Sequence, residues 1–382
     1  MSIPFLRSRT GPAVMATGVL AFASACTDVQ PPWAQSSTSS SSGTAPQFQD
    51  ADLPAPPEGQ GFHFETEAFE VPQGVEQQDC YFFQVPGTAG QDVYINKIEV
   101  VQNEGSHHMN IFRVRTIPDT ADNLDPAKGL VQKAQDGQGP CFKSANWADW
   151  PLVMNSQVDE KIDWTLPTGV AHKFQAGEWM MLQTHYVNAA TQTTPFRGHV
   201  EVNFWSIPQD QVTSELGTIF ATKQSIRICQ SNPEPTFEGS CQFNSTEQTT
   251  IVGANAHFHS RGKKFDMWGW DGTSATTPPE SEKFYSSEDW EEPPMSRSPE
   301  LSKVIPPGGG VWYSCSYEWQ EPAGSVTCES LNQIDSQPHA GQPATPADEL
   351  DCCYTFGGVV DRGEHCNIFV YYYPKSDDVN CF

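Results

Sequence analysis

The stretch TIVGANAHFH, residues 250–259, decides the fold class because it is short, largely apolar and ends in two alternating histidines. Such a pattern predicts a β-strand, in which residues two apart point to the same face. Neutral imidazole is the commonest side-chain ligand for metals, so His257 and His259 can hold one ion without distorting the strand. Asn255 shares their face. An incidental pair of strand histidines is the alternative that this stretch leaves open by itself.

Six further segments are brief, β-rich and bounded by Gly, Pro, Asn or Asp: residues 93–101, 107–114, 179–187, 200–205, 311–317 and 367–373. Long helical repeats with caps are absent from the sequence, and 31 prolines and 29 glycines interrupt it throughout. We therefore predict an all-β protein of sandwich or jelly-roll type.

The domain organisation follows from length and composition. Roughly 320 residues follow the N-terminal region, which is large for one sandwich and natural for two. A polar break at residues 206–211 lies near the middle. We predict two tandem jelly-roll-type β-sandwich domains, residues 62–208 and 209–382.

The N-terminal region resembles that of an exported lipoprotein. Two arginines precede an uncharged stretch, residues 10–26, which is too short to cross a bilayer. It ends in Ala-Ser-Ala-Cys, similar to the lipobox of bacterial lipoproteins. We expect residues 1–25 to be a signal peptide, Cys26 to be lipidated, and the Ser- and Pro-rich residues 26–61 to be a tether in the cell envelope. An ordinary cleaved signal is the alternative.

Charge and cysteine content limit the partners and the compartment. The net charge is −26 with 18% charged residues, which excludes nucleic acid because phosphate binding needs basic clusters. We expect membrane contact through the lipid anchor only. Once Cys26 is set aside, ten of the eleven cysteines remain, which suggests up to five disulfides in an oxidising compartment. Zinc knuckles would need a Cys-x-x-Cys spacing that the sequence lacks.

Two other histidine runs occur in predicted strands. Adjacent residues on a regular strand point to opposite faces, so His107 and His108 can share an ion only where the strand is irregular. Turn-forming residues 103–106 precede them and predict a bulge. By itself the pair is also typical of solvated or core histidines. In the other run Gln183 shares a face with His185 and is a candidate hydrogen-bond partner, with a core glutamine as the alternative.

Near the C-terminus, residues 363–371 alternate between two faces. One face is polar and ligand-like, and comprises His365, Asn367, Phe369 and Tyr371. The other is typical of a core, and comprises Cys366, Ile368 and Val370. This alternation predicts His365 as the third ligand to the ion of His257 and His259. An isolated structural histidine is the alternative.

Together these motifs resemble the copper type II, ascorbate-dependent monooxygenases, which include peptidylglycine α-hydroxylating monooxygenase and dopamine β-monooxygenase. The shared features are His-His-Met, Gln-x-His-Tyr, His-x-His and a closing Glu-x-Cys-Asn before a Tyr-rich strand. The resemblance extends over residues 80–381, with the motifs in the family's order. It implies two jelly-roll domains, each with one copper ion, facing each other across a solvent-filled cleft.

The resemblance also implies the ligand sets and the disulfides. The electron-transfer copper would be bound by His107, His108 and His185, and the catalytic, oxygen-activating copper by His257, His259 and His365. The family has methionine at the last position, so a harder, all-nitrogen site is expected here. The implied disulfides are Cys315–Cys366, Cys241–Cys381 and Cys80–Cys141. The pairing of the others stays open, namely Cys229, Cys328, Cys352 and Cys353.

The expected substrate departs from that of the peptide-amidating members. Those enzymes have an arginine where this chain has Asn255, and a tyrosine where it has Phe369, while Asn367 is retained. We take these three as candidate substrate-binding residues and expect an amine or another small organic molecule rather than a C-terminal glycine.

The expected function is hydroxylation of an activated C–H bond with O2, two copper ions and an external reductant such as ascorbate. An exported, non-catalytic copper-binding lipoprotein is the alternative. A binding module with structural zinc would need closed four-ligand sites, and three ligands per site argue against it. The sequence does not indicate the oligomeric state.

Overall fold

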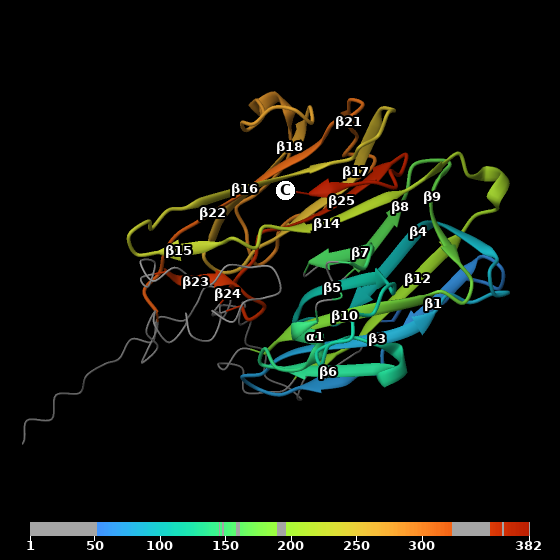
Figure 1. The fold of residues 1–382 in the computed structure, drawn as a ribbon. Helices are drawn as coiled ribbons and strands as arrows, with labels where there is room; N and C mark the ends of the chain where they lie inside the picture. The colour runs from blue at the N-terminus through green and yellow to red at the C-terminus, as the bar shows by residue number, and fades with distance from the viewer. Residues whose placement is uncertain are drawn as a thin grey trace, which may run out of the picture. The chain divides into compact units, whose positions relative to one another are not determined.

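A computed structural model of the 382-residue chain describes residues 52–144, 146, 149–157, 161–188, 196–322, 352–360 and 363–381. The expected signal peptide, Cys26, most of the tether and Cys328 lie outside these residues. The regular secondary structure of the described part is almost entirely β-strand, with a single short α-helix, α1 (Pro140–Lys143) (Figure 1). The predicted all-β class is therefore confirmed. Within the described part, no helix has the length and apolar character needed to span a membrane.

The first half of the chain forms two large sheets and a small one. The first sheet has the order β1-β12-β4-β9-β13, with β8 beside β4, and comprises β1 (Gly61–Glu65), β12 (Val200–Ser206), β4 (Asp92–Gln102), β9 (Val170–Gln175), β13 (Ser214–Glu215) and β8 (Lys161–Thr165). The second, in spatial order, comprises β6 (Val131–Gln135), β3 (Glu76–Gln84), β10 (Trp179–Val187), β5 (Ser106–Arg113) and β7 (Leu152–Gln157). The small sheet pairs β2 (Phe69–Val71) with β11 (Phe196–Gly198).

The second half forms three sheets. One, in spatial order, comprises β14 (Gly217–Thr222), β25 (Asn367–Tyr373), β17 (Thr249–His257) and β20 (Ser296–Arg297), with β21 (Lys303–Ile305) also on β17. Another comprises β19 (Lys283–Ser287), β18 (Gly262–Trp270), β22 (Gly310–Tyr317), β16 (Thr236–Gln242) and β26 (Asn380–Cys381). The third comprises β15 (Arg227–Cys229), β23 (Cys352–Phe356) and β24 (Gly363–Glu364). Single 3-10 turns are η2 (Pro126–Lys128), η4 (Gln209–Gln211) and η5 (Glu280–Glu282).

All seven predicted strands are present, as β4, β5, β10, β12, β17, β22 and β25. One differs at its end, because β17 stops at His257 and His259 lies in the turn that follows. Strand β13 ends at Glu215 and pairs in parallel with β9, so a sheet of the first half includes residues beyond position 208. The domain boundary at residue 208 stays a prediction.

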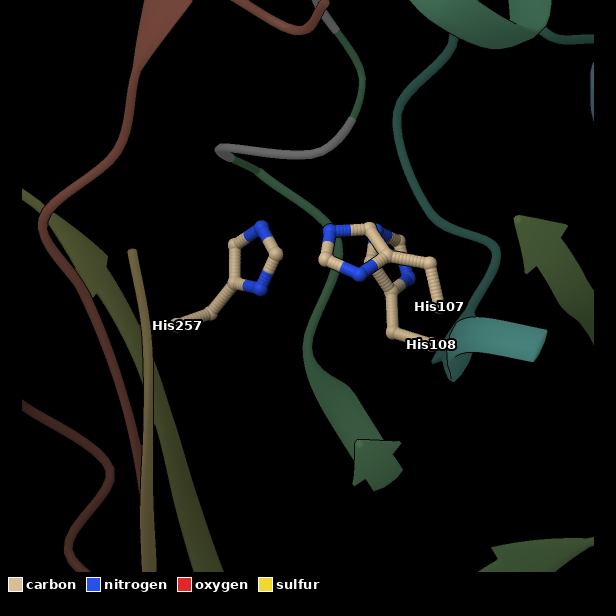
Figure 2. A group of neighbouring side chains, drawn as sticks. All are labelled: His107, His108 and His257. Atoms are coloured by element: carbon tan, nitrogen blue, oxygen red, sulfur yellow. The ribbon is translucent and has the colours of Figure 1, made fainter. Parts of the chain in front are cut away.

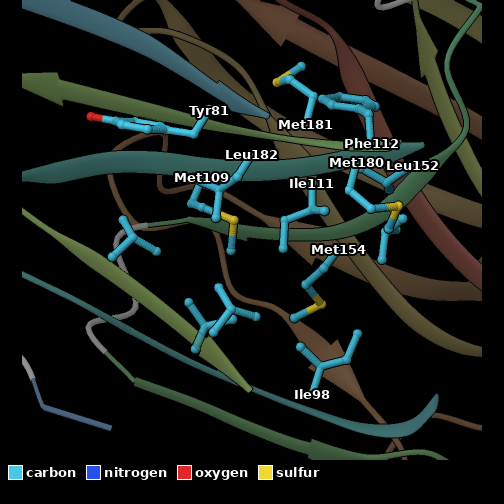
Figure 3. Packing of buried hydrophobic residues seen from close by; sticks show 14 of the residues in the cluster. Tyr81, Ile98, Met109, Ile111, Phe112, Leu152, Met154, Met180, Met181 and Leu182 are labelled. Atoms are coloured by element: carbon cyan, nitrogen blue, oxygen red, sulfur yellow. The ribbon is translucent and has the colours of Figure 1, made fainter. Parts of the chain in front are cut away.

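Strand β25 borders two apolar cores. Figure 3 shows part of the first core, where Met109, Ile111 and Met154 from β5 and β7 pack together. Phe369 and Tyr371 of β25 belong to this core, whereas its alternate residues, including Ile368 and Val370, belong to the second. The predicted alternation between two faces is therefore confirmed, but the face of Phe369 and Tyr371, predicted to be polar and ligand-like, is part of the first apolar core. Because β25 fills both cores, it fixes the position of the residues just before it, which include His365.

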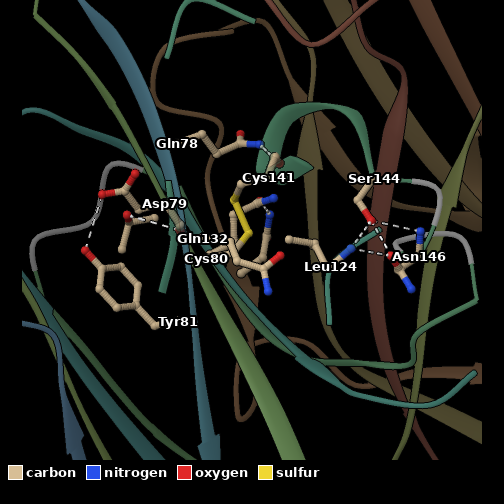
Figure 4. Close-up of a disulfide and its surroundings, with 12 residues drawn as sticks. Gln78, Asp79, Cys80, Tyr81, Leu124, Gln132, Cys141, Ser144 and Asn146 are labelled. Carbon is tan, nitrogen blue, oxygen red and sulfur yellow. Dashed lines mark hydrogen bonds between the residues drawn. A yellow bond between two sulfur atoms is a disulfide. The ribbon is translucent and has the colours of Figure 1, made fainter. Parts of the chain in front are cut away.

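Four disulfides cross-link the described residues. They are Cys80–Cys141 (Figure 4), Cys229–Cys352, Cys241–Cys381 and Cys315–Cys366. Three of them are the pairs that the resemblance implies, and the bond between Cys229 and Cys352 joins two cysteines whose pairing was open. Disulfides at this density are typical of proteins from oxidising compartments.

Burial of His172 on β9 leads to a prediction about pH. Burial lowers the pKa of His172 to about 3, helped by the positive charges of Arg113 and Lys375. Above its ordinary pKa the ring is neutral in both the folded and unfolded states, so it adds no pH dependence. As the pH falls from about 6.5 towards 3, only the unfolded chain takes up the proton, and folding stability decreases by about 1.4 kcal/mol per pH unit. Urea unfolding of His172→Gln should show a shallower loss of stability than the native chain in this window and the same slope above it. Equal slopes throughout would contradict a neutral, buried His172.

Candidate metal centre

A bulge in β5 brings two adjacent histidines to the same side of the strand. On β10, His185 lies opposite His108 and Tyr186 lies opposite Ser106, so His107 is the extra residue. The rings of His107 and His108 are 5.3 Å apart between centroids, and that of His107 is 5.1 Å from the ring of His185. The predicted bulge is confirmed, and its effect is to gather three imidazoles at the end of β5 and β10.

A second group of three histidines comes from the second half of the chain. His257 ends β17, His259 follows in the turn, and His365 lies between β24 and β25. The ring of His365 is 5.2 Å from that of His257 and 4.4 Å from that of His259. One nitrogen of each ring lies within 4.8 Å of the others. The structure therefore brings together the three residues that the sequence assigned to one ion.

The two groups are in direct contact through His257. Its ring centroid is 5.1 Å from that of His107 and 5.0 Å from that of His108, and these three also form a group with nitrogens within 4.8 Å. Figure 2 shows the ring of His257 facing the rings of His107 and His108. The expected solvent-filled cleft between two separate sites is therefore wrong for this structure. His107 is 8% exposed, His259 is fully buried and His365 is half-buried, so the six histidines form one cluster in which five members are buried.

Strand β7 explains why no cleft separates the groups. It is the edge strand of the β6-β3-β10-β5-β7 sheet, and it lies against the second half of the chain (Figure 1). Thr218 of β14 donates to the carbonyl of Leu152 at 2.6 Å, and the backbone N–H of Asn155 donates to the hydroxyl of Tyr371 at 2.8 Å. Gln157 contacts His257 directly. The chain thus closes over the histidines on this side.

A series of hydrogen bonds between buried amide side chains also links the two halves. Asn255 donates to Asn155, Asn155 donates to Asn110 at 2.5 Å, and Asn110 donates to Gln183 at 2.8 Å. The amide of Asn110 also lies 3.3 Å from Nδ1 of His108. Gln183 therefore reaches the histidines through Asn110 rather than by bonding to His185. Asn255, expected at a substrate pocket, is instead fully buried and belongs to this hydrogen-bonded series.

Outer partners fix which nitrogen of three imidazoles faces the cluster. Nε2 of His185 lies 2.8 Å from a carboxylate oxygen of Glu76, which can only accept. Nδ1 of His259 donates to the carbonyl of Gly363 at 2.9 Å, and Nδ1 of His257 donates to Gln157 at 3.0 Å. The remaining nitrogen of each neutral ring therefore presents a lone pair to the cluster.

The resulting lone pairs point at one another. Nε2 of His257 and Nε2 of His259 are 3.2 Å apart, and both are acceptors in these tautomers. Two facing lone pairs repel unless a cation lies between them. Donor atoms around a single ion with bonds of about 2.0 Å are separated by roughly 3 Å, which matches this distance. Nε2 of His107 is also buried, with no hydrogen-bond partner among the described residues. The cluster therefore fits a metal ion.

Burial keeps the histidines ready for a metal. It lowers the pKa of His107 to about 4. Burial, together with neighbouring imidazoles, places the pKa values of His108, His185, His257 and His259 well below the usual range. At neutral pH these rings are unprotonated, so protons do not compete with a metal for their lone pairs.

An ion pair beneath His259 holds the turn after β17. Glu364 is fully buried and accepts from the backbone N–H of His259 at 3.1 Å and of Arg261 at 3.0 Å. The Arg261 guanidinium also donates to Glu364 at 3.2 Å and stacks on Tyr354 at 3.5 Å. Burial raises the pKa of Glu364 to about 7, against the opposing effect of Arg261. This network fixes the turn that carries His259.

Most of these supporting residues were not predicted from the sequence. Glu364 lies inside a recognised motif and could have been found there. Glu76 and Gln157 gave no local signal, because they act on histidines that lie 109 and 100 residues away in the chain.

A small cavity of about 60 Å³ adjoins the cluster. Its lining includes His108, His185, His257 and His365, together with amides and aromatic rings. Asn367 and Phe369, two of the expected substrate-binding residues, line it, and Asn255 is not among its lining residues. The carbonyl oxygen of the Asn367 side chain is buried without a hydrogen-bond partner among the described residues. The cavity therefore offers an uncharged wall with one unused acceptor.

Comparisons with known proteins leave the family open. No protein-family model matches the chain, and no curated protein matches it. Among solved structures, the chain is similar to "a putative secreted protein from Parabacteroides distasonis ATCC 8503", at 7% identity and a TM-score of 0.20. The match covers 85% of this chain and 91% of that one. A likeness this low carries no argument about function.

Proposed function

We propose that the protein is a copper-dependent monooxygenase that hydroxylates an activated C–H bond of a small organic molecule. The observation that carries this proposal is the single cluster of six histidines, five of them buried, in which the lone pairs of His257 and His259 face each other. Its ligand types suit copper, because imidazole binds both of the accessible copper oxidation states. The resemblance to the ascorbate-dependent monooxygenases supplies the choice of copper over other metals.

The reaction needs two electrons from outside. Bound copper supplies one-electron transfer and the activation of O2. One oxygen atom enters the C–H bond, and the other leaves as water with two protons and two electrons from a reductant such as ascorbate. Two copper ions would be held by the two histidine groups, His107, His108 and His185, and His257, His259 and His365. Since the groups touch through His257, electron transfer between them would not require a long path.

The chain's own residues would orient the ligands and exclude water. Glu76 holds the outer N–H of His185, while Gly363 and Gln157 hold those of His259 and His257. Glu364 anchors the turn that carries His259. These partners keep the rings neutral and correctly turned before a metal arrives, which lowers the reorganisation needed on binding.

The cavity lining favours an uncharged substrate group. Four phenylalanines line it, namely Phe112, Phe220, Phe356 and Phe369, and Phe220 stacks on Phe369 at 5.1 Å between centroids. The polar lining consists of amides and imidazoles, and the described lining residues include no carboxylate, lysine or arginine. A hydrocarbon or aromatic group, or a neutral amine, fits such a wall better than a carboxylate or an ammonium ion. Asn367 would accept a hydrogen bond from the substrate.

The test combines metal analysis with turnover. Purified protein should bind copper and consume O2 in the presence of ascorbate and a small aromatic amine or alkylbenzene, with one hydroxylated product per O2. Asn367→Asp retains the side-chain shape but adds a charge to the cavity, and should lower turnover while copper content stays unchanged. Copper binding without substrate-dependent O2 uptake across the panel would contradict the enzyme.

An exported copper-binding protein without oxygenase activity is the second candidate. Two observations favour it: His365 in place of the family's methionine, and the small volume of the cavity. It predicts the same copper content with no hydroxylated product from any substrate. Product analysis therefore separates the two candidates.

His365 provides a direct prediction about the metal. It lies beside His257 and His259, and we expect His365→Ala to weaken copper at that group by about 100-fold or more, since even outer partners of metal ligands are worth 10- to 100-fold. His365→Met should restore binding with a preference shifted towards Cu(I), because thioether is the softer ligand. X-ray absorption on the reduced protein measures the change. Unchanged nitrogen coordination in His365→Ala would mean that His365 is not a ligand.

We further propose that the mature protein is anchored through a lipidated Cys26. Cys26→Ala should then move the protein from the detergent phase to the aqueous phase on Triton X-114 partitioning. Ser24→Ala is the matched control, because it exchanges one small residue for another and leaves the lipobox intact. A native N-terminus that is unmodified and begins beyond residue 26 would contradict the anchor.

A further inference from the structure

A second cluster of metal-binding side chains lies in the other large sheet of the first half, on β1 and β12. His63 and Glu65 are two residues apart on β1, and Glu201 on β12 lies directly opposite Glu65. All three side chains therefore project from one face of the sheet. Nε2 of His63 is 3.9 Å from a carboxylate oxygen of each glutamate, and the three potential ligand atoms lie within 4.8 Å of one another. We propose that His63, Glu65 and Glu201 bind a divalent cation of the zinc type, independently of the proposed copper cluster.

A hydrogen bond from Nδ1 orients His63 towards the two carboxylates. Asn203 donates through its side-chain nitrogen to the carbonyl of Pro54 at 2.8 Å and to Glu99 at 3.2 Å, and both of these groups can only accept. The oxygen of Asn203 therefore faces Nδ1 of His63, at 2.8 Å, and accepts its proton. Nε2 of the same ring then faces Glu65 and Glu201, with a carboxylate oxygen of each at 3.9 Å. The three side chains therefore turn their potential ligand atoms towards one common space.

The carboxylate of Glu201 is buried and is oriented by groups that carry no permanent charge. Glu201 is 6% exposed, and its ion-pair partners among the described residues are histidines only. The backbone N–H of Leu53 donates to one of its oxygens at 2.7 Å, and Nε2 of His199 lies 3.0 Å from the other. These contacts orient the carboxylate without bringing a permanent charge, as outer partners of metal ligands do. A buried carboxylate without a cation carries a large desolvation cost.

The distances between His63 and the two glutamates suit a bridging metal ion better than direct hydrogen bonds. At 3.9 Å, His63 is too far from either glutamate for a hydrogen bond. Ligand atoms of a tetrahedral zinc ion with bonds of 2.0–2.1 Å are roughly 3.3 Å apart, so small rotations of the exposed Glu65 and of His63 would complete the site. One imidazole with two carboxylates favours zinc and similar ions over calcium or magnesium, which prefer oxygen alone.

Such an ion would stabilise the pairing of the edge strand β1 with β12. β1 lies at the end of its sheet and pairs there with β12. A cation held by two residues of β1 and one of β12 would cross-link them beside the backbone contact of Leu53. Binding to the folded state alone would raise its stability in proportion to the logarithm of the zinc concentration.

The experiment compares Glu65→Gln with the native full chain in zinc titrations. The matched control is Glu67→Gln, because Glu67 is also exposed and lies two residues further along. We expect Glu65→Gln to bind one zinc equivalent fewer and to lose zinc-dependent thermal stabilisation, whereas Glu67→Gln should match the native protein. The affinity at this site should fall by about 100-fold or more.

Crystals soaked in zinc chloride provide the second readout. Anomalous scattering at the zinc edge should place an ion between His63, Glu65 and Glu201 in the native protein, and His63→Gln should abolish that peak while any zinc at the histidine cluster remains. Equal zinc equivalents in native protein and Glu65→Gln, or no anomalous peak at His63 in crystals whose histidine cluster is loaded, would overturn the proposal. Neither result depends on copper or on oxygenase activity.

Discussion

His257→Ala should empty both histidine groups of metal and abolish turnover. His257 is the residue through which the groups meet, since one of its nitrogens lies within 4.8 Å of nitrogens of His107 and His108, and likewise of His259 and His365. Its removal takes a ligand from the group of His259 and His365, and it leaves a gap beside His107 and His108, which its ring contacts. We expect copper affinity to fall by at least about 100-fold at both groups. Copper content after dialysis, together with the electron paramagnetic resonance of Cu(II), measures this loss.

The comparison variants make this prediction specific. His259→Ala should weaken the group formed with His365 and leave copper at His107 and His108, because His259 belongs to one group only. His172→Gln replaces a buried histidine outside the cluster and should retain both ions. If His257→Ala kept one full copper equivalent, the sites would be separable, as the sequence predicted, and the contact between them would not matter for binding.

Removing the Cys315–Cys366 bond should cause a large loss of stability and disturb one side of the cluster. The bond links residues 51 positions apart, and chain-entropy arguments give about 4 kcal/mol for a closed loop of this size. Cys366 directly follows His365, so its release also frees a proposed ligand. Replacing both cysteines by alanine should lower the free energy of unfolding by about that amount in urea and weaken copper at His259 and His365.

Cys80–Cys141 is the matched comparison, since it links residues 61 positions apart. Its removal should cost a similar free energy but act on the other side. Gln78 donates to the carbonyl of Cys141 (Figure 4), and Phe142 packs edge-on against His185 at 5.5 Å between ring centroids. Metal at His365 should stay unchanged in that variant. Equal metal loss at both groups in the two double variants would show that stability alone, and not the position of His365, governs binding.

Local pattern predicted much of this arrangement. Alternation identified the strands that carry the histidines, and the turn before His107 indicated the bulge that turns it beside His108. The two faces of residues 363–371 separated His365 from the core residues beside it. These features depend on neighbouring residues in the chain, so a single sequence carries them.

Long-range packing was beyond the reach of such patterns. The sequence placed Asn255 at a substrate pocket, but its partner is Asn155, a residue 100 positions away whose neighbourhood showed no chemical motif. The contact of His257 with His107 likewise depends on how β7 packs against β17 and not on either strand's own pattern. His63 and Glu65 have the same two-residue spacing as His257 and His259, so the sequence did contain a pattern typical of a metal site. Because the second residue is a glutamate, the pair did not stand out among the many acidic residues of the chain.

The division of β25 between two cores also determines the order in which the molecule can fold. The first core includes Phe369 and Tyr371, so the core beneath the sheets formed by residues 61–215 stays incomplete until β25, which is synthesised much later, packs against it. Contacts between such distant positions form slowly, because the chain loses the entropy of closing a long loop before the contacts stabilise it. An unfinished first half would expose apolar surface meanwhile, which makes it a natural client for chaperones until β25 arrives.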